Sequence, residues 1–393
     1  MVKYSIIIPT LNGKQSLELT IKYILSINRE DFEIIVSDNH SVDGTFKLLQ
    51  SFNDPRLKIF QPPNKLPHSE HLNFAYTKAT GLWINHIGDD DLIFNDRFEM
   101  LDELIKIGEK QDCEIFIGKS VRYIWPDNIF EKSNTINLDN FFGDTNKYDV
   151  KDGKKYYEEL INTLAVPGGG EFVLKRNVYE KVVNQLGFFC PSNPHVEFFG
   201  LRAAAFFAKN ILQVDTPFYI NGRMSKSIGN ALASNSNSFD WKFENPHGIW
   251  KFCPIETYAY NTISLDASLA VEQALGTKYF NKYFWGKTSA IYSITSSRGT
   301  DINNKIRSKR YILLKLLKNF PITSIISGLF YQIKDRGLNA FYSFIFNRIP
   351  NNYYSKHPFS KKAMSGDVIS VNKITDLADY YPLFKLRFKK HNH

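Results

Sequence analysis

The sequence predicts an α/β protein with a mostly parallel sheet flanked by helices, followed by a mainly helical C-terminal region. In the first part of the chain, short apolar, β-branched runs alternate with segments of helical period, and the links between them are short. Such alternation is typical of parallel strands joined by right-handed crossovers. Near residue 250 the pattern changes to long helical segments rich in Tyr, Phe, Lys and Asn.

The elements of the first part follow one another in a regular order. Pro9 closes the first apolar run, the Pro62-Pro63 pair stops the third, and Gly81 ends a helix, because proline lacks a backbone donor and glycine is the usual helix terminator. Residues 126–152 are polar and are expected to form a loop or insertion. The expected strands are residues 4–9, 32–37, 57–60, 82–87, 113–117 and 211–220, and the expected helices are residues 16–28, 45–52, 69–79 and one starting near residue 95.

Polar clusters lie where three of these strands end. Thr10-Leu11-Asn12-Gly13 follows the first strand, Asp38-Asn39-His40-Ser41 the second, and Gly88-Asp89-Asp90-Asp91 the fourth. Ligands of parallel α/β sheets bind beyond the carboxyl ends of the strands. The three clusters are therefore expected to share one site.

Asp89, Asp90 and Asp91 are the most informative of these residues. Three consecutive carboxylates after a buried strand raise one another's pKa and repel, and a cation between them removes that cost. Adjacent carboxylates with room for water suit Mg²⁺ or Mn²⁺ that substrate phosphates also hold. The alternative interpretation is a solvated acidic turn that caps the helix starting near Asn95.

Composition indicates a globular protein of two domains. The chain has 393 residues, 43% hydrophobic and 23% charged, which is more than one typical core supports. We expect a catalytic domain over residues 1–230 and a helical, basic domain over 231–393. Residues 1–249 hold 27 Lys or Arg against 32 Asp or Glu, a net −5, whereas residues 250–393 hold 22 against 8, a net +14. Different partners are expected for the two parts.

Localisation is expected to be cytoplasmic, with possible peripheral attachment to the inner face of the cell membrane. The three cysteines are scattered, the N-terminus runs directly into a strand, and no apolar window of transmembrane length occurs. Basic and aromatic segments after residue 305 suit an anionic membrane surface. The alternative is a helical domain that packs its own apolar faces. No nucleic-acid-binding motif is present, so no nucleic-acid partner is expected.

Three motifs together resemble family 2 glycosyltransferases. They are the segments Ser5–Gly13, Ile34–Thr45 and Gly88–Asp91, in this order and spacing, and the resemblance covers roughly residues 1–230. It implies the A-type glycosyltransferase (GT-A) fold, a nucleotide-diphosphate-sugar donor, a divalent metal and inversion at the anomeric carbon. A metal on the phosphate oxygens would neutralise the charge that develops as the diphosphate leaves.

The resemblance also implies roles for individual residues. Asp90 or Asp91 would contact the metal and Asp89 the ribose or a metal-bound water, with the register left open. Asp38 would accept the imide N–H of a uracil ring; a turn cap is its alternative. The expected nucleotide-sugar-binding residues are Pro9, Thr10, Asn12, Asp38, Ser41, His68, Ser69, Asn73, Asp89, Arg223 and Lys226, and the expected metal ligands are Asp89, Asp90 and Asp91.

Two outer segments complete the expected donor site. His68 and Ser69 begin a helix whose N-terminus would face the donor diphosphate, since helix N-termini favour anions; a plain serine cap is the alternative. Asn73 would lie on the nucleotide side. Arg223 and Lys226 would close on the diphosphate as a lid, or they are ordinary exposed basic residues.

Inverting transfer also requires a base that takes the proton of the acceptor hydroxyl. In the family this is usually an Asp or Glu ahead of a Leu-Arg helix, here Leu201-Arg202. Alignment on Pro194 puts His195 at that position, and a shift of two residues puts Glu197 there. Both are named, with Glu197 preferred as the more ordinary chemistry; a helix-start role is the alternative for each.

These inferences lead to one functional hypothesis with two rivals. The chain would transfer a sugar, from a UDP-sugar, to a hydroxyl of a glycan or lipid-linked acceptor in surface polysaccharide synthesis. The departure at His195 motivates the first rival, a catalytically idle scaffold that binds nucleotide-sugar or glycan. The second rival is a sugar-phosphate nucleotidyltransferase, but the segment Pro9–Gly13 is not the glycine-rich, basic phosphate loop that such an enzyme carries.

Overall fold

The chain was analysed as a computed structural model. It describes residues 1–127, 135–137, 147–164, 166–191, 196–225, 252–254, 260–295, 309–336 and 368–370.

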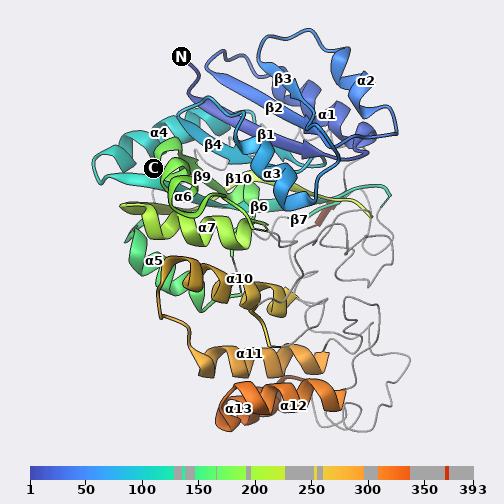
Figure 1. Cartoon of the computed structure of the whole chain (residues 1–393). Coiled ribbons are helices and arrows are strands. Elements are labelled where there is room, and N and C mark those ends of the chain that lie inside the picture. The colour runs from blue at the N-terminus through green and yellow to red at the C-terminus, as the bar shows by residue number, and fades with distance from the viewer. Residues whose placement is uncertain are drawn as a thin grey trace.

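Eleven strands of the described residues form one sheet (Figure 1). Its strands are β1 (Tyr4–Thr10), β2 (Phe32–Asp38), β3 (Leu57–Phe60), β4 (Trp83–His86), β5 (Leu92–Ile93), β6 (Cys113–Ile124), β7 (Thr135–Asn137), β8 (Tyr148–Asp152), β9 (Phe172–Lys175), β10 (Asn210–Arg223) and β11 (Val368–Ser370). Their order is β11-β7-β6-β9-β4-β1-β2-β3, and β10 pairs with β5, β6 and β8. The longest pairings, β1 with β2 and β6 with β10, are parallel, as are β1 with β4 and β2 with β3.

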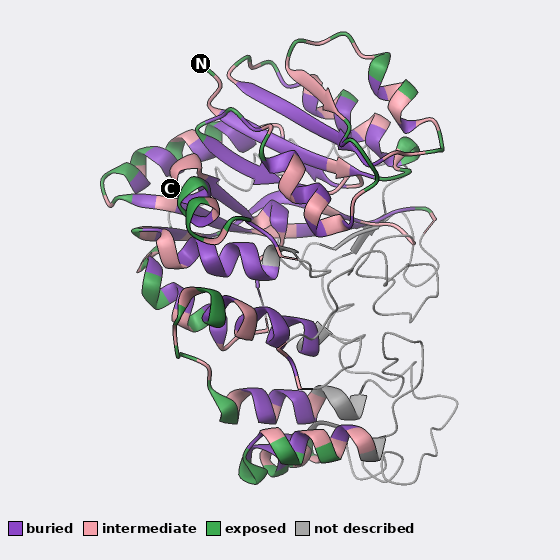
Figure 2. Cartoon of the chain, viewed as in Figure 1, coloured by how far each residue is buried: buried purple, intermediate pink, exposed green. Residues whose placement is uncertain are grey.

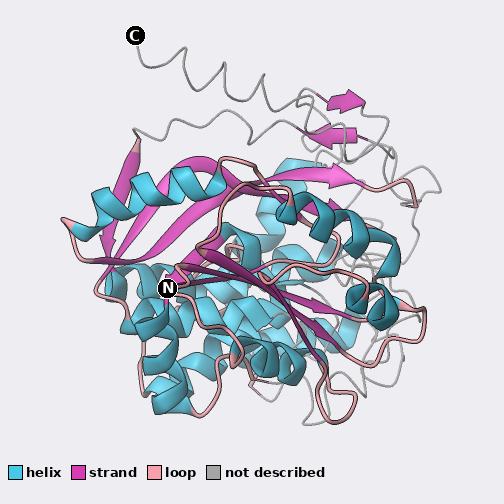
Figure 3. Cartoon of the chain, turned by 90° about the horizontal axis from the view of Figure 1, so that it is seen from above, coloured by secondary structure: helices cyan, strands magenta, loops and turns pink. Residues whose placement is uncertain are grey.

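Helices lie on both faces of this sheet, where they enclose two separate cores (Figure 3). The helices of the described residues are α1 (Lys14–Leu25), α2 (Thr45–Gln50), α3 (His68–Tyr76), α4 (Arg97–Glu109), α5 (Gly153–Ile161), α6 (Arg176–Leu186), α7 (Val196–Phe207), α10 (Tyr260–Leu275), α11 (Lys282–Thr295), α12 (Lys309–Asn319) and α13 (Ile322–Arg336), with a short 3₁₀ turn, η1 (Gly169–Glu171). The predicted fold class and the helical C-terminal region are confirmed.

The central strands are buried on both sides, which explains their continuous β-branched runs. Successive side chains of a strand point to opposite faces. Ile7 therefore packs into the core beneath α3, α5, α6 and α7, whereas Ile6 and Ile8 pack into the core beneath α1 and α4. All three side chains are buried, and the central strands are mostly purple in Figure 2.

The middle of the chain departs from the expectation of a loop over residues 126–152. The strand predicted at 113–117 continues to Ile124, because β10 pairs with it along its whole length through register shifts. Residues 135–137 and 148–152 form β7 and β8, which extend the sheet by antiparallel pairing with β6 and β10. Their sequences are polar since both strands lie toward the outside of the sheet, where apolar periodicity is weak.

The C-terminal helices stack away from the sheet (Figure 1). Arg202 of α7 is fully buried and donates hydrogen bonds to the carbonyl of Leu160 in α5 and to Ser264 Oγ in α10. Side chains of α10 and α7 share one hydrophobic core, although the two helices lie on opposite sides of residue 230. The division into two domains at that residue stays a prediction. Over the described residues, no helix combines the length and the apolar character that crossing a membrane requires.

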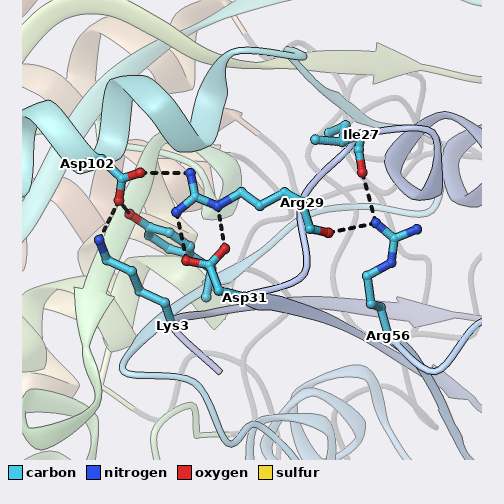
Figure 4. Close-up of polar contacts among 7 residues, drawn as sticks. Lys3, Ile27, Arg29, Asp31, Arg56 and Asp102 are labelled. Atoms are coloured by element: carbon cyan, nitrogen blue, oxygen red, sulfur yellow. Dashed lines mark hydrogen bonds and ion pairs between the residues drawn. The ribbon is translucent and has the colours of Figure 1, made fainter. Parts of the chain in front are cut away.

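A network of hydrogen bonds and ion pairs joins α4 to the residues that precede β1, β2 and β3 (Figure 4). Asp102 of α4 accepts hydrogen bonds from Tyr4 Oη at 2.7 Å and from Arg29 Nη1 at 2.7 Å, and it pairs with Lys3. Arg56 donates to the carbonyls of residues 27 and 29. Burial raises the pKa of Asp102, but the hydrogen bonds from Arg29, Lys3 and Tyr4 outweigh it and lower the pKa to about 2. The network lies at the opposite strand ends from the polar clusters, so we assign it to the fold.

Candidate active site

The ends of β1, β2 and β4 come together as the sequence predicts. Thr10 and Asp38 are register partners at the last position of β1 and β2, and the backbone N–H of Asn39 donates to the carbonyl of Thr10 at 2.9 Å. His86 ends β4 opposite Ile7 of β1, and the aspartate triplet follows after Ile87 and Gly88. The three polar clusters thus lie at one edge of the sheet.

Asp89 is held against the end of β1. Its Oδ2 accepts a hydrogen bond from Thr10 Oγ1 at 2.5 Å. Gly13 approaches so closely that a Cβ on it would lie 2.0 Å from Asp89 Oδ2 and 2.5 Å from Thr10 Oγ1. The loop after β1 therefore accepts only glycine at position 13 without displacing the carboxylate.

Asp91 has a different environment from its two neighbours. Its side chain is buried, Oδ2 accepts the backbone N–H of Gly88 at 2.7 Å, and Oδ1 accepts that of Gly222 in β10 at 2.8 Å. Thr20 of α1 also donates to the Asp91 carbonyl at 2.9 Å. Both carboxylate oxygens thus fix the backbone of the turn, which is a positioning role.

Asp90 lies against Trp125 and against Gly222 of β10. Trp125, just after β6, donates from Nε1 to the Asp90 carbonyl at 3.0 Å, and a Cβ on Gly222 would lie 1.9 Å from the same oxygen. Burial and the charges of Asp91 and Asp89 raise the pKa of Asp90 well above its usual range. Burial raises the pKa of Asp89 to about 6, against the opposing hydrogen bond from Thr10.

These carboxylates fit the divalent cation that the resemblance implies. Asp89 and Asp90 present hard oxygen donors in a crowded, like-charged arrangement that a cation would relieve. Among the described residues, no cluster of three or more His, Cys, Asp or Glu side chains has metal-binding geometry. A small number of protein ligands is typical of Mg²⁺ held jointly with substrate phosphates. The predicted ligand set of Asp89, Asp90 and Asp91 stays a prediction, and within it both carboxylate oxygens of Asp91 already accept backbone hydrogen bonds.

Asp38 carries an unpartnered acceptor. The side chain is 0% exposed, and Oδ2 accepts hydrogen bonds from the Ser41 backbone N–H at 3.2 Å and from Gln61 Nε2 at 3.0 Å. Its Oδ1 is buried without a hydrogen-bond partner. An orphaned carboxylate oxygen is costly in a folded protein, so a ligand donor at this position would lower the free energy of the site.

Asn12 and Ser41 join two loops to each other. Asn12 has a positive φ of 58°, its backbone N–H donates to Ser41 Oγ at 2.8 Å, and its Oδ1 accepts the backbone N–H of Val42 at 2.8 Å. Both side chains were predicted to bind the nucleotide, yet these contacts shape the loops. Pro9 lies half-buried in β1, and Val42 is exposed beside Asn12.

Helix α3 begins near the same edge. His68 is its first residue, and burial lowers the pKa of His68 to about 4. Ser69 is buried, its Oγ has no hydrogen-bond partner, and the helix has no side-chain cap. The serine-cap alternative is therefore not what the structure contains. His71 instead contacts β2, with Nε2 2.8 Å from Ser37 Oγ.

The side chain of Asn73 in α3 makes its hydrogen bonds to the backbone of a distant segment. Its Oδ1 accepts the backbone N–H groups of Phe189 and Cys190 at 3.1 and 2.9 Å, and its Nδ2 donates to the Cys190 carbonyl at 2.6 Å. These hydrogen bonds fix residues 189–190 to α3, and the nucleotide contact of Asn73 stays a prediction. Residues 189–190 precede the segment that contains the candidate bases.

The remaining predicted residues are only partly placed. Arg223 ends strand β10, with its carbonyl accepting the backbone N–H of Trp125 at 3.2 Å, so the expected lid begins as sheet. Lys226 and His195 lie outside the described residues. Glu197 belongs to α7 by its backbone, but its side chain also lies outside what the structure describes.

Four residues of the site were missed by sequence reasoning: Gly13 as a close contact, Thr20, Trp125 and Gly222. Thr20 had a detectable signal, because it is a polar residue within the apolar stripe of α1, where Leu17, Ile21 and Ile24 are buried. Trp125 and Gly222 come from strands far away in the sequence, and no local pattern marks them. The aspartate triplet is thus held by α1, β6 and β10 together.

Comparison with known proteins agrees with this architecture. Residues 5–183 match the model of the glycosyl transferase family 2 domain. A solved structure of S. aureus TarS 1-349 in complex with UDP-GlcNAc superposes with a TM-score of 0.52 and 13% identity, over 91% of this chain and 93% of that one. At that identity the likeness shows the fold alone, a GT-A glycosyltransferase fold.

Curated relatives match over the N-terminal part. The GalNAc(5)-diNAcBac-PP-undecaprenol β-1,3-glucosyltransferase of Campylobacter jejuni is 37% identical over 94 residues, 23% of this chain and 30% of the relative. The UDP-Glc:α-D-GlcNAc-diphosphoundecaprenol β-1,3-glucosyltransferase WfgD of Escherichia coli is 30% identical over 97 residues, 24% of this chain and 38% of the relative. The match thus spans well under half of each relative.

Residues 5–183, somewhat under half of the chain, thus resemble a family 2 glycosyltransferase domain in sequence, and the chain resembles the GT-A glycosyltransferases in fold.

Proposed function

We propose that this protein is a metal-dependent, inverting glycosyltransferase that uses a UDP-sugar. Its acceptor is a hydroxyl of a glycan, carried on a lipid-linked intermediate of surface polysaccharide synthesis. The observation that supports this most strongly is the pair of crowded carboxylates, Asp89 and Asp90, beside an unpartnered Asp38 Oδ1 at one sheet edge.

The uracil ring and the diphosphate of the donor are assigned to different parts of this sheet edge. Asp38 Oδ1 accepts the imide N–H of uracil, a donor that cytosine lacks at the same position, which favours UDP over CDP. Asp89 and Asp90 would hold Mg²⁺ or Mn²⁺, which would neutralise the charge of the departing diphosphate. The uncapped start of α3, at His68 and Ser69, presents backbone N–H groups that favour an anion.

The chemical step is a single displacement. The acceptor oxygen attacks the anomeric carbon from the side opposite the diphosphate, a new C–O bond forms, and the bond from that carbon to the UDP oxygen breaks. The acceptor proton passes to Glu197 or His195, and UDP leaves with the bonding electron pair. Asn73 positions the segment that leads to these bases by fixing residues 189–190.

The acceptor class is proposed from the relatives and from the charge of the chain. Both curated relatives carry undecaprenol-linked acceptors in their names. A helical region of net +14 over residues 250–393 suits a substrate presented at the inner face of the cell membrane. The catalytic domain is assigned to residues 1–230 and the acceptor side to residues 231–393.

Release of UDP from a panel of UDP-sugars, with and without Mn²⁺, tests this function. Asp90→Asn keeps the shape of the side chain and removes its charge, so turnover should fall by at least about 100-fold. Asp112→Asn is the matched control, because Asp112 lies away from the strand-end site and its positive φ of 52° suits asparagine. Unchanged turnover in Asp90→Asn would contradict the metal assignment.

Replacing the two candidate bases separately tests the mechanism. Either Glu197→Gln or His195→Gln should lose turnover by at least about 100-fold while UDP binding is retained. A wild-type protein that binds UDP with Mn²⁺ but turns over no donor with any acceptor would instead identify the idle scaffold.

A further inference from the structure

Helix α13 has two apolar faces. One face packs on α11: Ile325 is buried, and a Cβ on Gly328 would lie 2.4 Å from the Lys287 carbonyl of that helix. The other face carries Ile322, Ile326 and Phe330, which are 60%, 44% and 66% exposed. Their four-residue spacing places them in one stripe along the helix. The close contact of Gly328 with α11 fixes which face of α13 packs inward. The stripe of Ile322, Ile326 and Phe330 therefore stays on the outer face.

Helix α12 repeats this arrangement next to α13. Ile312, Leu316 and Phe320 are buried in the C-terminal core, whereas Leu314 and Leu317 are exposed. The two helices are joined through Pro321 and lie together at the end of the molecule farthest from β1, β2 and β3 (Figure 1). Large apolar side chains gathered on a surface in this way indicate a site of interaction.

The charges along these two helices are mostly positive. Residues 302–336 contain eight Lys or Arg and one acidic residue, Asp335. Lys318 is exposed one helical turn after Leu314, and Lys334 is exposed one turn after Phe330. Lysine side chains beside an apolar stripe place their stems along it and their ammonium groups at its rim. The surface is therefore apolar in the middle and cationic at the edge.

We infer that α12 and α13 form a docking surface for an anionic lipid membrane. Apolar side chains would enter the headgroup region while the lysines contact acidic headgroups, which is the arrangement of an interfacial amphipathic helix. A second copy of the chain fits less well, because two such surfaces would bring like charges together. The surface, called here the α12–α13 surface, goes beyond the proposed function, and its binding does not require sugar transfer.

Sedimentation of the full chain with vesicles tests this surface. The probes are vesicles of phosphatidylcholine alone and of phosphatidylcholine with an equal share of phosphatidylglycerol. The wild-type chain should bind the second kind and not the first, and added salt should weaken binding. The triple variant Ile322→Ser, Ile326→Ser, Phe330→Ser and the double variant Lys318→Glu, Lys334→Glu should each lose at least about tenfold in affinity.

Controls separate this result from misfolding. Leu82→Ser with Tyr148→Ser removes two exposed apolar side chains from the sheet domain and should bind as wild type. All substituted side chains are exposed, so thermal melting should be unchanged, and UDP binding reports on the sheet edge independently. Absence of binding by the wild-type chain, equal binding to both vesicles, wild-type binding by the triple variant, or self-association that the triple variant abolishes would each overturn the inference.

Discussion

Replacing Gly13 by alanine is the smallest change that should disable the site. The new methyl carbon would lie 2.0 Å from Asp89 Oδ2, whereas real contacts of this kind do not fall below 3.0 Å, so the carboxylate must move by at least about 1 Å. The backbone at Gly13 has φ −97° and ψ 11°, which alanine adopts without strain. The effect therefore falls on the carboxylate and not on the loop.

The size of this effect follows from the displacement. Misplacing a catalytic group by about 1 Å costs roughly 100-fold in rate, so the turnover of Gly13→Ala should fall by about that factor. The hydrogen bond from Thr10 to Asp89 would be lost as well, which costs about 1 kcal/mol of unfolding free energy. Activity should therefore change far more than stability.

Turnover by UDP release, UDP affinity in Mn²⁺ and thermal melting together provide the assay. Gln15→Ala, an exposed change two residues away, should behave as wild type. Thr10→Val removes the same hydrogen bond without adding bulk against Asp89, and its loss of turnover should be smaller than that of Gly13→Ala. Wild-type turnover and wild-type UDP affinity in Gly13→Ala would refute the reasoning.

Three other perturbations follow from the same contacts. Gly222→Ala drives a Cβ to 1.9 Å from the Asp90 carbonyl, so it should lose both turnover and about 1–3 kcal/mol of stability in a denaturant titration; an unaffected midpoint would contradict the contact. Asn73→Ala leaves the Phe189 and Cys190 N–H groups without their acceptor, so it should cost about 1–3 kcal/mol and lower kcat while UDP affinity, measured by calorimetry, is retained. Burial lowers the pKa of His71 from 6.5 to about 3, so between these pH values the unfolded chain binds a proton that the folded chain does not. The free energy of unfolding therefore falls as the pH drops below 6.5, and at pH 5.5 this histidine accounts for about 1.4 kcal/mol of lost stability. His71→Gln should remove this share from the difference between denaturant titrations at pH 7.5 and pH 5.5.

Local sequence patterns predicted the sheet well, and they predicted that three polar clusters meet at one of its edges. The apolar, β-branched runs at residues 4–9 and 32–37 specify β1 and β2. The rule that parallel strands present their carboxyl ends at one edge joins Thr10, Asp38 and Asp89. The short strands β7 and β8 were missed because their stability comes from pairing with β6 and β10, and not from an apolar period of their own.

The division of labour among the aspartates was beyond sequence reasoning. Three identical side chains in a row carry no signal of which one faces inward. Only the partners decide it: Asp91 meets the N–H of Gly222, more than a hundred residues away, whereas Asp89 meets Thr10. Asn73 is a similar case, since its polar character suggested a ligand and its hydrogen bond to residue 190 is a tertiary contact.

Calorimetric titration of UDP, with GDP and dTDP beside it and with and without Mn²⁺, tests the central claim most directly. The proposed site at the ends of β1, β2 and β4 predicts that UDP binds in the presence of Mn²⁺ and only weakly without it, and that Asp38→Asn reduces this binding because the acceptor for the uracil imide is impaired. Absence of binding by all three nucleotides in the presence of Mn²⁺ would contradict the claim that this sheet edge is a nucleotide-sugar site.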